Sequence, residues 1–165
     1  MSDVMTSGRA RPSARDWTAD ARSAAWLRAT AVVYGVAWAV HTGDHLRRGL
    51  GVVTGEVAVL GSAAAVVQLV AVWAVLKRRP WAAVAAVAIG LPDALGIAAV
   101  HLLPRWSSFS DAFPGAHGTG VTGFSWFAAV VEIAAAAAFG VSGALAWRSA
   151  LAPRSAPTPS ASPGP

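Results

Sequence analysis

The segment HTGDH, residues 41–45, places three side chains with metal-binding chemistry in one short stretch. His41, Asp44 and His45 are spaced i, i+3 and i+4, so they share one helical face if the helix continues through Gly43. Two imidazoles at i, i+4 can hold one metal ion, with a carboxylate as a further oxygen ligand. The spacing therefore predicts a candidate metal site here.

Further nitrogen and oxygen ligands lie near the ends of other apolar segments. The full set of candidate metal ligands is His41, Asp44, His45, Glu56, His101 and His117. These donors suit a transition metal such as Zn, Mn, Fe or Cu. A variant is haem b held by two histidines on different helices, such as His41 and His101. The alternative interpretation is that these groups only cap helix ends and pair with Arg47, Arg48 and Arg105.

Three polar side chains fall inside the apolar segments themselves, and these are Asp93, Glu132 and Gln68. An ionisable group inside a bilayer is costly, so it is a functional candidate by default. Asp93 and Glu132 could serve a proton relay, a cation site or a metal. The structural alternative is that each acid joins helices by a hydrogen bond, with Gln68, Tyr34, Ser125 or a histidine as its partner.

The composition explains why these segments are expected to be membrane helices. Of the 165 residues, 55% are hydrophobic and only 13% are charged, whereas a soluble domain carries about 25% charged residues. Each apolar segment is about 20 residues or longer and lacks the alternation of a barrel strand. The sequence predicts an all-α, four-transmembrane-helix bundle with spans at about 24–46, 52–76, 81–103 and 121–147.

Charge predicts the orientation of this polytopic bundle. With four spans, both termini share one side, and that side holds Arg9, Arg11, Arg15, Arg22, Arg28, Lys77, Arg78, Arg79, Arg148 and Arg154. The other side holds only Arg47, Arg48 and Arg105. The positive-inside rule then places both termini in the cytoplasm, N-in/C-in. Arg28 and the cluster Lys77, Arg78 and Arg79 carry most weight because they adjoin spans. We expect a multi-pass protein of the plasma membrane, in a cell with a GC-rich, bacterial type of genome.

The domain organisation follows from the same pattern. Residues 1–23 are expected to be a disordered basic cytoplasmic tail, 24–148 the transmembrane domain, and 149–165 a disordered tail rich in Pro, Ser and Ala. The basic net charge of +5 does not indicate nucleic-acid binding, since the arginines adjoin apolar spans. The expected partners are the lipid bilayer and a second copy of the chain or a larger membrane complex.

Function is narrowed but not identified by these residues. The absence of cysteine excludes thiolate metal sites and a cysteine nucleophile, and no P-loop, GxSxG or HExxH motif is present, so an enzyme is not the favoured class. One hypothesis is a small membrane protein that binds metal or haem at its outer face. A second is a structural or accessory subunit that associates through small residues at Ala136, Gly140 and Ala144. A third is an oligomeric transporter or channel component that uses Asp93 and Glu132.

Overall fold

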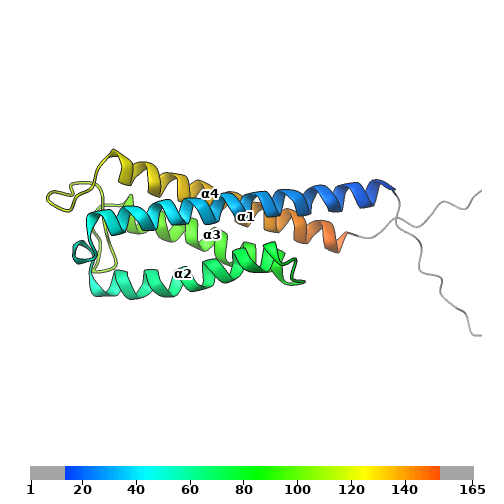
Figure 1. The fold of residues 1–165 in the computed structure, drawn as a ribbon, viewed down its shortest axis with the longest axis horizontal. Coiled ribbons are helices and arrows are strands. Elements are labelled where there is room, and N and C mark those ends of the chain that lie inside the picture. Colours follow the sequence, from blue (N-terminus) through cyan, green and yellow to red (C-terminus); the bar gives the residue numbers. More distant parts are fainter. Residues whose placement is uncertain (1–13, 153–165) are drawn as a thin grey trace, which may run out of the picture.

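A computed structural model describes residues 14–152 of the chain, and these residues are predominantly helical. The bounds of the helices are α1 Ala14–Arg48, η1 Leu50–Val52, α2 Gly55–Leu76, α3 Ala82–His101 and α4 Gly123–Leu151. Figure 1 shows the four α-helices running side by side in one bundle. The described part of the chain contains no strand, which confirms the predicted all-α fold class.

Within residues 14–152, four helices are long and apolar enough to cross a membrane. The apolar stretches are Ala21–Arg48, Gly55–Leu76, Ala82–His101 and Gly123–Leu151. At a rise of 1.5 Å per residue, even the shortest reaches about 30 Å, the thickness of a bilayer's hydrocarbon core. The predicted spans differ from these stretches by only a few residues at each end.

The first and last helices both extend into the ranges predicted to be tails. α1 begins at Ala14, so residues 14–23 belong to a helix and not to a disordered tail. The reason is local, because the chain has neither Gly nor Pro between Ala14 and Gly35 to interrupt a helix. Likewise α4 continues to Leu151, beyond the predicted boundary at 148. The rest of the two predicted tails, residues 1–13 and 153–165, lies outside the described residues.

The closest helix packing joins α3 to α4 through small residues. A Cβ built on Gly90 would lie 2.6 Å from the backbone oxygen of Ala136, and one built on Gly140 would lie 2.7 Å from Leu91. Ala136 and Gly140 are both buried in this contact. α3 of the same chain therefore covers these two members of the small-residue face that was predicted to bind another chain.

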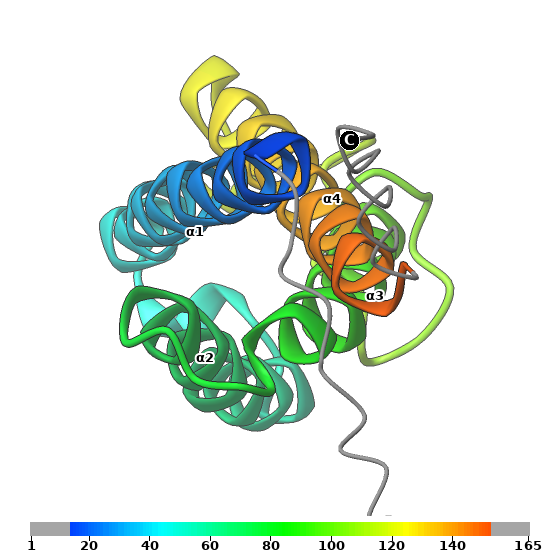
Figure 2. The same cartoon turned by 90° about the vertical axis from the view of Figure 1, so that its right-hand side faces the viewer.

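Helix α1 also packs on α4. The rings of Tyr34 and Phe139 stack with their centroids 5.1 Å apart, and the hydroxyl oxygens of Thr30 and Ser142 are 2.6 Å apart. Figure 2 shows the resulting arrangement, a ring in the order α1, α4, α3, α2. The interior of this ring is where polar groups from different helices can meet.

Helix α2 closes onto the bundle over only one half of its length. Its buried residues all fall in the second half, and they are Gln68, Ala71, Ala74 and Val75. None of the residues from Gly55 to Val67 is buried. The first half of α2 begins beside η1, with Thr54 as its N-cap accepting a hydrogen bond from the backbone N–H of Val57. Helix α2 is consequently less tightly packed on the bundle at the end that holds η1 and the 102–122 connection.

Candidate metal centre

Three histidines from two helices converge at the end of the bundle that holds η1. His41 and His45 come from α1, and His101 is the last residue of α3. One nitrogen from each ring lies within 4.8 Å of the other two. The ring centroids are 4.8 Å apart for His41 and His45, 4.8 Å for His41 and His101, and 5.4 Å for His45 and His101. Because α1 continues through Gly43, the predicted sharing of one helical face by His41 and His45 is confirmed.

Each imidazole of this triad has an oxygen close to its Nδ1 atom. His41 Nδ1 is hydrogen-bonded to Oε2 of Glu132, and His101 Nδ1 donates to the backbone oxygen of Asp111 at 3.1 Å. His45 Nδ1 lies 3.8 Å from Oδ2 of Asp111. An oxygen acceptor at Nδ1 favours the tautomer in which Nε2 carries the lone pair. The Nε2 atoms of His41 and His101 are therefore free to ligate a metal, whereas the 3.8 Å at His45 is too long for a hydrogen bond and leaves the tautomer of that ring open.

The Nε2 atom of His41 is unusual for a buried polar atom. The His41 residue is only 6% exposed, and its Nε2 has no hydrogen-bond partner among residues 14–152. A buried polar atom without a partner costs about 1–3 kcal/mol, so such atoms are rare in folded proteins. A metal ion shared with His45 and His101 would satisfy this lone pair.

Asp111 lies between the histidine triad and Arg48, the last residue of α1. Its carboxylate accepts two hydrogen bonds from the guanidinium of Arg48, both at 2.7 Å. Burial acts to raise the pKa of the Asp111 carboxyl, but the hydrogen bonds and charge of Arg48 outweigh it and lower the pKa overall. Asp111 thus stays ionised beside His45 and His101, where it favours a cation.

The hydrogen bond between Glu132 and His41 confirms the expectation that this acid joins helices with a histidine as its partner, although the sequence did not indicate which histidine. The depth of each residue along its helix was the signal in the sequence that could have indicated this contact. At 1.5 Å per residue, His41 lies about 10 Å from the end of α1 at Arg48, and Glu132 lies about 14 Å from the start of α4 at Gly123. Glu132 is 2% exposed. Sequence left open which face of α4 carried it, because that helix is apolar all round.

Not every predicted ligand joins the triad. Asp44 is fully buried but turns to Arg47, whose guanidinium donates to its Oδ1 at 2.8 and 2.9 Å. Glu56 is exposed near the start of α2, and His117 is exposed in the 102–122 connection. The alternative expectation, that outer acids pair with neighbouring arginines, is thus confirmed for Asp44 with Arg47.

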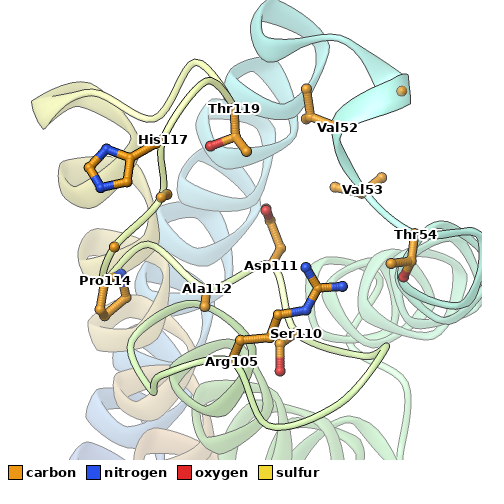
Figure 3. A pocket seen from close by; sticks show the side chains of 13 residues that line it. Val52, Val53, Thr54, Arg105, Ser110, Asp111, Ala112, Pro114, His117 and Thr119 are labelled. Atoms are coloured by element: carbon orange, nitrogen blue, oxygen red, sulfur yellow. The ribbon is translucent and has the colours of Figure 1, made fainter.

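Figure 3 shows where His117 lies instead. It lines a second pocket of about 410 Å³ formed by the 102–122 connection and the η1–α2 junction. In this view His117 stands at one side of that pocket and Thr54 at the other, with Asp111 between them. Asp111 thus lines this pocket and also contacts the triad, since its backbone oxygen accepts the hydrogen bond from His101.

Asp93 belongs to a separate set of hydrogen bonds, about two helical turns before His101 on α3. Tyr34 donates its hydroxyl hydrogen to one carboxylate oxygen at 2.6 Å, and the Gln68 amide donates to the other at 2.5 Å. These bonds join α1, α2 and α3 at one point. The expectation that a hydrogen-bonded acid connects helices, with Gln68 or Tyr34 as its partner, is confirmed for Asp93.

The triad opens on a cavity of about 530 Å³ between α1, α2 and α3. All three histidines line it, as do Gln68, Asp93 and Glu132. Most of its remaining wall is apolar, contributed by residues such as Val57, Leu60, Ala64, Ile89, Ile97 and Val100. A ligand bound to the metal would therefore have room on the side facing α2.

Comparisons of the chain with protein-family models, with curated proteins and with solved structures find no match. The chemistry of the three imidazoles, and of the groups that hold them, is what supports a functional proposal.

Proposed function

We propose that this chain is an integral membrane protein that binds one divalent transition-metal ion through His41, His45 and His101. The observation that carries the proposal is the convergence of three ring nitrogens within 4.8 Å. The oxygens of Glu132 and Asp111 next to the Nδ1 atoms support it, because metal-ligating histidines almost always donate their other N–H to such a group.

The donor set favours zinc or a similar ion over the alternatives. Three imidazoles with an open fourth position are a known zinc arrangement, and imidazole also suits copper, iron and nickel. With Zn–N bonds of about 2.0–2.1 Å, tetrahedral ligand atoms stand about 3.3 Å apart. Binding would therefore draw the nitrogens together by at most about 1.5 Å from the 4.8 Å limit of the present arrangement.

Haem b fits this geometry less well. A haem held by two axial histidines needs the porphyrin plane between their rings. The rings of His41 and His101 are in edge-to-face contact, with centroids 4.8 Å apart, and His45 occupies the space beside both. A compact ion requires no such separation of the rings, so a bare metal ion is the ligand we propose.

The membrane placement is part of the same proposal. Four long apolar helices support insertion, and the basic residues beside the spans support cytoplasmic termini. Of the arginines at the opposite end, Arg47 and Arg48 are paired with Asp44 and Asp111, which further reduces the free positive charge there. The metal centre would then lie beneath the outer surface of the plasma membrane.

Metal content of the detergent-purified chain tests the proposal. After loading with Zn²⁺ and gel filtration, elemental analysis should give one zinc per chain. The substitutions His41→Ala, His45→Ala and His101→Ala should each remove most of it. His45→Ala is the decisive variant, because the His45 side chain is 26% exposed. Its removal leaves the hydrogen bond between Glu132 and His41 undisturbed.

His117→Ala is the matched control, since it removes an exposed histidine at the same end of the bundle. Its zinc content should equal that of the unsubstituted chain. Circular dichroism would establish that each variant keeps its helices. A fully helical unsubstituted chain that retains no zinc would refute the proposed metal site.

A further inference from the structure

We infer that the proposed metal centre binds a single-chain amphiphile from the bilayer. The oxygen-bearing head group of this molecule ligates the metal, and its tail fills the cavity beside α2. This inference rests on the proposed metal site and names the chemical class of its ligand. The starting observation is that His41, His45 and His101 all line a cavity of about 530 Å³. That volume is within the range of about 300–1,000 Å³ typical of small-molecule sites.

The distribution of side chains in the cavity matches an amphiphile. Groups that can bind a polar head are the three histidines together with Gln68, Asp93 and Glu132, whereas the α2 and α3 walls are mainly Val, Leu, Ile, Ala and Gly. Ligand sites of this kind combine an apolar lining with a few convergent polar groups. A purely polar substrate would leave the apolar walls without a partner.

The exposure of the α2 wall indicates that this cavity is open toward the lipid. Apart from Gln68, its α2 wall is built from the half of that helix in which no residue is buried, and Leu60 on this wall is 53% exposed. The neighbouring Val59 and Val66 are 73% and 64% exposed. Within a bilayer these side chains would contact acyl chains, so a lipid-soluble molecule would reach the cavity sideways, between α1 and α2.

Two glycines leave the space for a tail. Gly61 of α2 and Gly96 of α3 both line the cavity, and a Cβ added at either would meet no atom within 4 Å. By contrast, Gly90 and Gly140, at the α3–α4 contact, have neighbours closer than 3 Å. Larger side chains at Gly61 or Gly96 should therefore fill the cavity without disturbing the bundle.

The experiment uses the detergent-purified, full-length chain loaded with Co²⁺, whose visible absorption reports ligands at the open position. Acetohydroxamate and octanohydroxamate are the probes, because they share one metal-binding head and differ only in their tails. If the tail is buried, affinity should rise roughly fourfold for each methylene removed from water. Octanohydroxamate should therefore bind far more tightly than acetohydroxamate.

Gly61→Leu and Gly96→Leu should lower octanohydroxamate affinity by at least about tenfold and leave Co²⁺ and acetohydroxamate binding unchanged. Gly43→Leu is the matched control, since Gly43 is an exposed helical glycine with no neighbour within 4 Å and does not line the cavity. Comparing variants in one detergent cancels any partitioning of the probe into micelles.

The outcomes separate the two proposals. Co²⁺ binding with the same octanohydroxamate affinity in all three leucine variants would overturn the amphiphile site but leave the metal centre standing. Co²⁺ binding without any spectral response to either hydroxamate would do the same. Absence of a cobalt spectrum in the folded, unsubstituted chain would overturn both.

Discussion

Glu132 of α4 receives the Nδ1 hydrogen of His41 from α1, so that two helices meet through an acid–imidazole pair inside the bundle. Both residues are almost completely buried, at 2% and 6% exposed. The pair leaves His41 Nε2 without a partner among the described residues. An acid in this position fixes the ring and makes its free nitrogen a better metal ligand.

The first prediction concerns this pair. Glu132→Gln keeps the size of the side chain but removes its charge, so the metal should bind about 10–100-fold more weakly. Competition between the protein and a zinc chelator measures this change. Asp93→Asn is the matched control, because Asp93 is also an acid lining the cavity but bonds Tyr34 and Gln68 instead of a histidine. Equal zinc affinity in Glu132→Gln and the unsubstituted chain would contradict the role given to Glu132.

The second prediction concerns the pair of Arg48 and Asp111, which anchors the 102–122 connection to α1. The Arg48 side chain is fully buried and donates two bonds of 2.7 Å. Replacing Asp111 with Asn would leave this guanidinium uncompensated, at a cost of about 3–5 kcal/mol. Thermal unfolding in detergent should show a clear fall in Tm.

The matched comparison for Asp111→Asn is Asp44→Asn. Asp44 pairs with Arg47, whose side chain is 42% exposed and can turn to water when the acid is lost. The fall in Tm should therefore be smaller for Asp44→Asn. A similar fall in the two variants would mean that the Arg48 pair has no special structural role.

The sequence was sufficient to predict the four helices and to bring the three histidines of the proposed metal centre to one end of the bundle. Segments of about 20 apolar residues predict helices with little ambiguity, and HTGDH places His41 and His45 on one face. Alternation of four helices brings His101 to the same end. These inferences depend only on periodicity and on the order of elements, which the residues themselves determine.

What sequence could not supply depends on contacts between elements. The Asp111 backbone oxygen that holds His101 is positioned by the path of the 102–122 connection, which contains no regular helix or strand. The inward direction of Glu132 depends on how α4 is rotated, and an alanine-rich helix gives no apolar stripe from which to read that rotation. The turn of Asp44 toward Arg47 removes a ligand that the i, i+3 spacing had favoured.

The third prediction tests the α3–α4 contact. A Cβ at Gly90 would lie 2.6 Å from the Ala136 oxygen and 2.7 Å from the Gly140 nitrogen, both backbone atoms that cannot move aside alone. Gly90→Ala should therefore destabilise the protein by about 1–3 kcal/mol, despite alanine's better helix propensity. Unfolding by heat in detergent measures the loss.

Gly61→Ala is the control for this contact, since its Cβ would meet nothing within 4 Å. It should leave stability unchanged or raise it by up to about 1 kcal/mol through helix propensity. Gel filtration should give the same oligomeric state for both variants, because α3 and α4 of one chain make this contact. A change of oligomeric state in Gly90→Ala alone would instead favour association through the small-residue face.

The fourth prediction tests the proposed orientation, which places the metal centre near the outer surface. The chain has no cysteine, so one introduced cysteine can be labelled without background. Ser108 is exposed in the 102–122 connection, and Ala150 is exposed at the opposite end of the bundle, near the end of α4. With both termini in the cytoplasm, a membrane-impermeant maleimide added to intact cells should label Ser108→Cys and spare Ala150→Cys.

Permeabilised cells should show labelling of both, which controls for access to each thiol. The reverse pattern in intact cells would place the histidines at the cytoplasmic side and limit the metal supply to the cytosol.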